Sequence, residues 1–276
     1  MIVFCQSEGV TKQNNDTLAN SKSSFKRSLY FGAGFGSNFI YLGSSISQNK
    51  PYYSTALIFE PFDGFFLTSS ASHISMTYPF VAFYSLGGSY RHTVNSWFDY
   101  SADLSYYITP ESLQETLFNN FALINLTTGF DWRLIYTKLT ISGLHSNSNS
   151  GYIQLRNSHY FSTKSFFKGK ASLSFDPYIN LLFGRLVRIE TTTGPAKFGN
   201  APPFVHLRKK QTTTTTTTYS YVFSMMDTEF SVPVTLNFTN FSLEAEPIYI
   251  LPAYSNIDYP APKGFLLNIT AYIRIF

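Results

Sequence analysis

An alternation of apolar and polar residues with a period of two runs through most of the chain and constrains its fold more than any other feature. In the segment 264–276 every second residue from Phe265 onward is apolar, and polar residues such as Asn268 fall between them. The segments 97–108 and 121–132 repeat the pattern, with Asp, Ser, Thr and Asn on the polar side. Successive side chains of a β-strand point to opposite faces, so this period predicts strands with one apolar and one polar face.

The alternation divides the chain into twelve segments, joined by short and long connections that roughly alternate. The segments cover residues 28–42, 52–61, 64–75, 78–90, 96–108, 120–131, 133–144, 151–162, 168–190, 212–236, 241–251 and 264–276. Pro177 leaves open that the ninth segment forms two strands, and ten or fourteen strands are the alternatives to twelve. The connection 109–119 has the composition of a short helix. No linker divides the chain, so residues 28–276 are predicted to form one domain.

Two architectures contain many alternating strands: a soluble sandwich or barrel with apolar faces inside, and a membrane barrel with apolar faces outside. The segments are longer than ordinary soluble strands and suit a tilted strand that crosses a bilayer. Only 13% of the residues are charged, against about 25% in ordinary soluble domains. Aromatic residues gather near segment ends, as in interfacial girdles, at Tyr52, Tyr53, Tyr78, Phe80, Tyr106, Tyr107, Trp132, Tyr160 and Phe161. These features favour an all-β fold, a single closed antiparallel transmembrane β-barrel, over the soluble sandwich.

The last part of the chain carries a resemblance to a known class. The final segment ends in Phe276, and the stretches 231–236 and 246–249 read Ser-Val-Pro-Val-Thr-Leu and Glu-Pro-Ile-Tyr. In these features the chain resembles Gram-negative outer-membrane β-barrel proteins, particularly uncharacterised barrels of Bacteroidota-type bacteria. One difference is that Phe276 shares a face with Arg274, whereas the terminal aromatic of that class shares the apolar face.

The resemblance implies an integral location in the cell outer membrane, with both termini in the periplasm and the long loops outside. It also implies contacts with the lipid bilayer and with lipopolysaccharide. The barrel-assembly machinery is a further expected partner, with Phe276 as the signal that it reads.

If the apolar faces point outward, the lumen receives the charged residues of the inward faces. The candidates are Asp99, Asp103, Asp131, Lys138, Arg156, Lys170, Arg188, Glu190, Asp227, Glu229, Glu244, Glu246 and Arg274, together with Gln154. Buried charges are expected to pair, so these residues serve either as structural ion pairs or as contacts for a solute. Gly32, Gly34 and Gly36 also fall inside, where we expect them to admit a neighbouring side chain rather than a solute.

The most direct function for such a barrel is that of a narrow, porin-like channel for small polar solutes. The alternative is a non-conducting structural or interaction barrel that anchors surface loops or takes part in a secretion assembly. A third hypothesis is an outer-membrane lipid hydrolase, because His73 and Ser75 stand two residues apart on one strand face. No orienting residue can be assigned to His73, and the glycine of the usual hydrolase motif is missing, so we expect no enzyme.

Other ligands find little support in the sequence. Basic residues are scattered apart from the triplet 208–210, so we expect no nucleic acid as a partner. Cys5 is the only cysteine and the histidines lack metal-ligand spacing, so we expect neither a metal nor another cofactor. Residues 1–27 resemble the remnant of a signal peptide, or a frayed end, followed by a disordered periplasmic lead-in. The threonine run 212–218 suits a strand that rises above the membrane.

Overall fold

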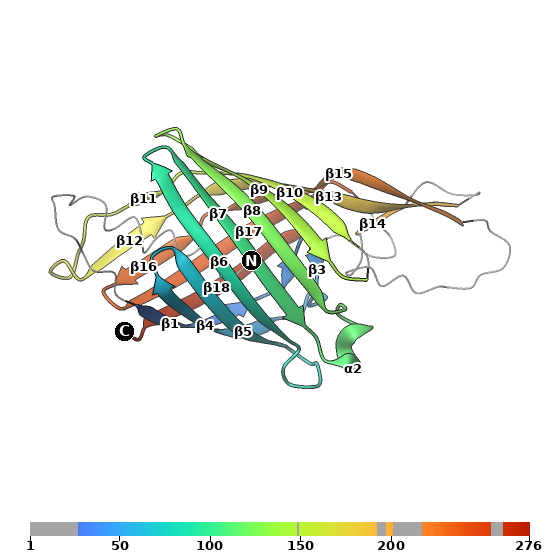
Figure 1. Cartoon of the computed structure of the whole chain (residues 1–276), viewed down its shortest axis with the longest axis horizontal. Coiled ribbons are helices and arrows are strands. Elements are labelled where there is room, and N and C mark those ends of the chain that lie inside the picture. Colours follow the sequence, from blue (N-terminus) through green and yellow to red (C-terminus); the bar gives the residue numbers. More distant parts are fainter. Residues whose placement is uncertain (1–26, 148, 192–196, 201–216, 255–261) are drawn as a thin grey trace.

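The computed structural model describes residues 27–276 except for 148, 192–196, 201–216 and 255–261. Within this part of the chain, twelve strands form a single closed antiparallel barrel in which the first strand pairs with the last (Figure 1). The barrel strands are, in chain order, β1 (Ser28–Gly36), β4 (Tyr52–Phe62), β5 (Phe65–Ile74), β6 (Phe83–Asn95), β7 (Phe98–Ile108), β8 (Phe121–Asp131), β9 (Tyr136–His145), β10 (Ser150–Ser158), β13 (Tyr178–Thr191), β15 (Thr217–Ser231), β17 (Phe241–Pro252) and β18 (Gly264–Arg274). The predicted lead-in, up to residue 26, and most of the threonine run lie outside the described residues.

Each of the twelve predicted segments overlaps one barrel strand, and the predicted all-β class is confirmed. The predicted bounds of the fourth segment are wrong, because its strand β6 runs over Phe83–Asn95 and not over 78–90. Four short strands extend the barrel strands at their ends. β11 (Phe161–Ser162) follows β10, β12 (Ala171–Phe175) precedes β13, and β16 (Val234–Phe238) follows β15. The fourth, β14 (Lys197–Asn200), pairs with β13.

Proline interrupts two of the long strands without changing their register. Tyr178 pairs with Ser231, and three residues farther on Phe175 pairs with Val234, so β12–β13 and β15–β16 keep the same alignment. Pro177 lies in the gap of the first of these strands. Because proline has no N–H, it removes a hydrogen bond from the ladder. The ninth predicted segment is therefore one barrel strand with a break, and the strand count stays at twelve.

The two ends of the barrel differ. β1 begins and β18 ends at one end, which we call the turn end because short turns join most strands there. The connections 37–51 and 109–120 lie at the opposite end, the loop end, where β17 ends and β18 begins. The predicted short helix is confirmed as α2 (Glu111–Gln114), also at the loop end (Figure 1).

Apolar side chains cover the outside of the barrel. Leu104 pairs with Ile124 and Leu126 with Ile141 on neighbouring strands, and all four are about half exposed. A closed barrel leaves no unpaired strand edge, so such a surface can face hydrocarbon. Among the described residues, no helix is long and apolar enough to cross a membrane.

The predicted aromatic girdle is correct only in part. Of each tyrosine doublet one ring faces outward and the other inward: Tyr53 is 51% exposed, whereas Tyr52 is 2% exposed and lies inside. Likewise, Tyr106 faces outward, whereas Tyr107 packs inside the barrel. Consecutive residues of a strand point to opposite faces, so a doublet cannot place both rings at the membrane interface.

The first connection departs most from the prediction. The strand predicted for 28–42 ends at Gly36, and the following residues turn into the barrel instead of forming an outer loop. They include two short strands, β2 (Ile40–Tyr41) and β3 (Ser44–Ser45), which form a small separate hairpin. We call residues 38–49 the plug hairpin. Burial of its apolar side chains inside the barrel removes them from water, which an outer loop would not do.

Candidate functional site: a plugged lumen

The plug hairpin is held in shape by a tight turn and by one asparagine. Leu42 and Gly43 have φ values of 47° and 74°, as a two-residue hairpin turn of the primed type requires. The amide of Asn38 donates to Oδ1 of Asn49 (2.8 Å), and its carbonyl oxygen accepts from the hydroxyls of Ser45 (2.8 Å) and Ser47 (2.7 Å). Asn38 thus ties both arms of the hairpin together.

Aromatic rings pack the plug hairpin against the barrel wall. Phe39 lies 5.0 Å from Tyr52 and 5.2 Å from Phe83, measured between ring centroids. Tyr41 lies 5.4 Å from Tyr107 and also approaches Phe121. The α2 connection adds Leu113, Leu117 and Phe118 to this core. Stacked and tilted ring pairs add stability beyond their buried area, so the hairpin is a packed part of the loop end.

The tip of the hairpin reaches across the lumen to β13 and β15. A Cβ atom on Gly43 would lie 2.8 Å from Cε of Met226 and 3.4 Å from Cδ2 of Leu182. The register between β13 and β15 shifts at this point, and both Met226 and Asp227 are buried. A β-bulge places two consecutive side chains on one face, which here brings both toward the hairpin tip.

Tyr254, just beyond β17, packs against the same apolar core. Burial, together with the nearby Asp227 carboxylate, raises the pKa of Tyr254 to about 12. A tyrosine is neutral at physiological pH even at its ordinary pKa of about 10, so this shift only moves Tyr254 further from ionisation and changes no charge beside the plug hairpin.

Toward the turn end, the barrel encloses a cavity of about 360 Å³. We call it the polar cavity because of its charged and hydroxylated lining residues, although apolar residues such as Phe39, Leu182 and Ile248 line it as well. Its wall carries nine charged side chains: Glu60, Arg91, Asp99, Asp103, Lys138, Arg156, Glu229, Glu244 and Glu246. Six carboxylates against three cationic groups leave an excess of three negative charges by formal count. The chain as a whole has a net charge of +4, so the lumen has the opposite sign to the rest of the molecule.

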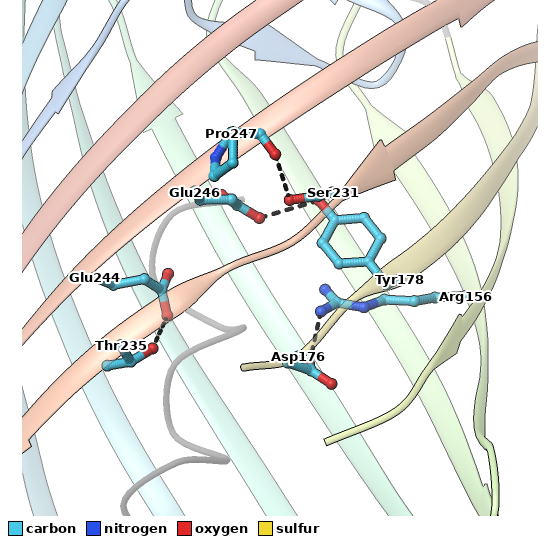
Figure 2. A network of polar contacts seen from close by, with 8 residues as sticks. All are labelled: Arg156, Asp176, Tyr178, Ser231, Thr235, Glu244, Glu246 and Pro247. Carbon is cyan, nitrogen blue, oxygen red and sulfur yellow. Dashed lines mark hydrogen bonds and ion pairs between the residues drawn. The ribbon is translucent and has the colours of Figure 1, made fainter. Parts of the chain in front are cut away.

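Polar contacts link several of these charges along the wall (Figure 2). Arg156 forms an ion pair with Asp176 (3.0 Å), and its guanidinium lies over the ring of Tyr178 at 3.8 Å from the centroid. The hydroxyl of Tyr178 donates to Glu246 (3.0 Å), which also accepts from the amide of Asn268 (3.3 Å). Strands β10, β13, β17 and β18 are thereby connected through one network.

Other carboxylates of the wall are held by neutral donors. Glu229 accepts from the amide of Asn180 (2.8 Å) and Glu244 from the hydroxyl of Thr235 (2.9 Å). Asp99 accepts from the hydroxyl of Tyr136 (2.6 Å). A neutral donor fixes a carboxylate without cancelling its charge, so these contacts preserve the negative character of the cavity.

The three glycines of β1 admit neighbouring side chains, as predicted. A Cβ atom on Gly32 would lie 2.7 Å from the ring of Tyr272, and one on Gly34 would lie 2.7 Å from Oγ of Ser54. At Gly36 the neighbours are Tyr52 and Asn268. The glycines therefore make room for the inward side chains of β4 and β18 and not for a solute.

The predicted lumen residues fall into three groups. Those that line the cavity are Asp99, Asp103, Lys138, Gln154, Arg156, Glu229, Glu244 and Glu246. Asp227 is buried above them beside the hairpin tip. The others lie at the ends of the barrel: Asp131 at the end of β8, Arg274 at the end of β18, Lys170 in the turn before β12, and Arg188 and Glu190 in the outer part of β13. The side chain of Glu190 lies outside the described residues.

Sequence reasoning missed two charges of the wall, Glu60 and Arg91. Both follow the inward parity of their strands, since Glu60 alternates with Tyr52 and Ser54, and Arg91 with Ser89. The fourth predicted segment ended at residue 90, one position before Arg91. The alternation could therefore have identified both residues, whereas no sequence signal indicated the plug hairpin.

His73 and Ser75 stand on the wall near the loop end. His73 stacks on Phe80, with 4.3 Å between ring centroids, and its Nδ1 is hydrogen-bonded to the carbonyl of Phe80. The N–H of Ser75 donates to the carbonyl of Pro51 (2.9 Å). In the described part of the chain, no group of three or more His, Cys, Asp and Glu residues is placed to hold a metal ion.

Comparison with known proteins supports the class of fold. No protein-family model matches the sequence, and no curated protein matches it. LpxR from Salmonella typhimurium is similar in structure, with a TM-score of 0.50, 7% identity, and coverage of 88% of this chain and 99% of that one. The NanC porin gives a TM-score of 0.46 at 8% identity, covering 89% and 98% of the two chains. An outer membrane channel from Pseudomonas putida F1 gives 0.44 at 11% identity, covering 93% and 100%.

The closed barrel and its apolar exterior define this chain as an integral outer-membrane β-barrel of the Gram-negative type. In this class short turns face the periplasm and longer loops face outward. The plug hairpin occupies the half of the lumen at the loop end, which we call the outer half.

Proposed function

We propose that this barrel is a narrow, porin-like channel for small polar solutes. The observation that carries the proposal is the polar cavity of about 360 Å³ within the barrel, lined by charged and hydroxyl side chains. A barrel that served only as an anchor would not need a water-accessible interior of this size, because packed side chains can fill a narrow barrel.

The distribution of charge supports preference for cations over anions. The carboxylates Glu229, Glu244 and Glu246 line one side on β15 and β17, while Arg91 and Lys138 on β6 and β9 flank Asp99 and Asp103 of β7. Arg156, the third cationic group, is paired with Asp176. Rings of acidic side chains favour cations in pores, so an excess of carboxylates in the cavity favours solutes that are neutral or positively charged.

Serine and threonine hydroxyls line much of the wall that β4 to β9 form. The cavity is lined by Ser54, Thr68, Ser70, Ser72, Ser85, Ser89, Ser101, Ser105, Thr127, Thr140 and Ser142, on strands β4 to β9. Each hydroxyl can donate and accept a hydrogen bond. The hydroxyls of this wall can replace a hydrogen bond to water by one to a hydroxylated solute at little cost in free energy.

The experiment that tests the proposal is conductance of the purified barrel in planar bilayers. Stepwise current increases in KCl, which vanish when the protein is heat-denatured before reconstitution, are the expected result. Reconstituted barrels that remain folded, shown by a faster gel mobility before boiling, and yet carry no current would contradict the channel.

A non-conducting interaction barrel is the second candidate, and the plug hairpin is the observation that favours it. The hairpin and the apolar core around it fill much of the outer half of the lumen. In that case the conductance experiment gives no current, and removal of residues 38–49 would be needed to open the barrel.

We also propose that the barrel is not a lipid hydrolase. In support, the described hydrogen bonds join Nδ1 of His73 to the carbonyl of Phe80 and the N–H of Ser75 to Pro51, and none joins the His73 ring to the Ser75 hydroxyl, whereas a general base must lie within hydrogen-bond reach of its nucleophile. The expected surroundings of the barrel are lipid and lipopolysaccharide, and Phe276, 58% exposed, remains the proposed signal for the assembly machinery. Neither nucleic acid nor a cofactor forms part of the proposal.

A further inference from the structure

The plug hairpin is packed on most sides but not on all. Its rings contact β4, β6 and β8 through Tyr52, Phe83 and Phe121, and its tip contacts Met226 of β15. On the side of β17 and β18 a second cavity of about 170 Å³ separates the hairpin from the wall.

This second cavity lies between the base of the hairpin and the outer ends of two strands. Asn38, Ile40 and Asn49 line it from the hairpin, and Ser37, which is hydrogen-bonded to Leu267 of β18, lines it where the hairpin leaves the wall. Ile250 of β17 and Lys263, Gly264, Phe265 and Leu266 at the start of β18 line it from the wall.

The second cavity and the polar cavity share four lining residues. Asn38 and Ile40 of the hairpin, and Ile250 and Leu266 of the wall, border both. We call these four residues the neck. Because the same side chains border both spaces, the two cavities lie next to each other, with the neck between them.

We propose that solutes pass the plug hairpin on its β17–β18 side, and that the neck is the narrowest part of this route. The inference rests on the proposed channel function and specifies where the channel runs. The outer half of the lumen is thus closed on its packed sides and permeable along one wall.

The chemistry of the neck suits a size filter. Ile40, Ile250 and Leu266 are apolar, and a short apolar constriction hinders ions that must shed water. The amide of Asn38 is held in place by three hydrogen bonds within the hairpin. Ile250 is paired with Gly264. A Cβ atom on Gly264 would meet no other atom within 4 Å, so there is open space beside the neck.

The route changes from apolar to acidic directly below the neck. Leu266 is followed on the inward face of β18 by Asn268, whose register partner on β17 is Glu246. Asn268 donates to Glu246 (3.3 Å) and accepts from the hydroxyl of Tyr52 (3.4 Å). A solute that leaves the neck therefore meets a fixed acidic group, which favours a cationic or hydrogen-bonding solute over an anion.

The test introduces a tryptophan at the neck and compares its effect on conductance with that of a tryptophan on the opposite face of the same strand. Ile250→Trp is expected to lower single-channel conductance in KCl by about twofold or more, because the ring narrows the constriction. The matched control is Leu251→Trp. Leu251 is adjacent in sequence but faces outward, so conductance should stay at the level of the unmodified barrel.

A second variant removes any question of folding. Cys5 is the only cysteine, so Ile250→Cys in a Cys5→Ser background carries a single thiol. A methanethiosulfonate reagent added after insertion into the bilayer should then reduce the current through barrels that were already conducting, with larger reagents reducing it more.

The outcomes separate the two proposals. If the unmodified barrel conducts and modification at Ile250 leaves the current unchanged, the route past β17 and β18 is wrong while the channel function stands. If the unmodified folded barrel does not conduct, the channel function itself is wrong and the route falls with it. A current that drops at Ile250 and not at Leu251 supports both.

Discussion

Gly43 and Met226 lie in contact across the lumen, at a position where a Cβ atom on Gly43 would be 2.8 Å from Cε of Met226. The glycine also has a φ of 74°, which L side chains rarely adopt. Contact and conformation together disfavour any side chain at this position of the plug hairpin.

Gly43→Val should displace the tip of the hairpin and widen the outer half of the lumen. The β-branched side chain is disfavoured at positive φ and would overlap Met226. We expect larger single-channel conductance. Gly143→Val is the control, because a Cβ at Gly143 meets no atom within 4 Å. Equal conductance of the Gly43 variant and the unmodified barrel would show that the hairpin tip does not limit the current.

Asn38→Ala should loosen the plug hairpin while the barrel stays folded. The substitution removes three hydrogen bonds from a buried side chain. The hydroxyl protons of Ser45 and Ser47 and the amide oxygen of Asn49 lose this partner, at a cost of about 1–3 kcal/mol. Hydrogen exchange should therefore speed up in residues 38–49 and remain slow in β6 to β9. If the amides of residues 38–49 exchange as slowly in the variant as in the unmodified protein, Asn38 does not hold the hairpin in shape.

Glu246→Gln should reduce the preference of the channel for cations. The change removes one negative charge from the wall and keeps an oxygen that can accept from Tyr178. In a KCl gradient we expect the reversal potential to move toward zero. Glu115→Gln changes the net charge equally on an exposed residue after α2, and it should leave the potential unchanged. A barrel that prefers anions would contradict the proposed role of the acidic wall.

Arg156→Met should lower the stability of the barrel. It removes the ion pair with Asp176 and the contact over Tyr178, and it leaves a partly buried carboxylate without its partner. A hydrogen bond between charged groups contributes about 1.5–3 kcal/mol. Unfolding by urea in detergent micelles, followed by tryptophan fluorescence, should show this loss. Adding Asp176→Asn to Arg156→Met should restore part of it, and no difference between the single and double variants would argue against the pair.

Ser75→Ala should have no effect on lipid turnover. Among the described contacts, no hydrogen bond joins the Ser75 hydroxyl to the ring of His73, whose Nδ1 donates to the carbonyl of Phe80 instead. Membranes that contain the unmodified or the Ser75→Ala barrel should release fatty acid at the same background rate. Release that depends on Ser75 would overturn the assignment and restore the hydrolase hypothesis.

Much of the fold could be predicted from the sequence because the strand period is a local property. Alternation at 264–276 and in the other segments depends on neighbouring residues alone, and a barrel repeats the same local pattern twelve times. Even the break at Pro177 follows from the sequence, because proline has no N–H to donate to the strand ladder. The inward parity of residues such as Asp103, Lys138 and Glu246 follows from the same alternation.

The partners of these inward residues could not be predicted. Tyr178 and Glu246 are 68 residues apart in the chain and Arg274 and Ser28 are 246 apart, yet each pair is hydrogen-bonded. Such pairs depend on how the strands are staggered around the barrel. Stagger is set by closure of the whole sheet and not by any one segment.

The plug hairpin marks the limit most clearly. Phe39 and Tyr41 continue the alternation of β1, so the sequence predicts a strand through residue 42 with these rings facing lipid. In the structure the same rings turn inward, because the open end of the barrel offers a cavity lined by Tyr52, Phe83, Phe121 and Met226. Apolar side chains leave water equally well in a bilayer or inside a barrel. The sequence therefore determined that these residues are buried, and only the closed barrel decided where.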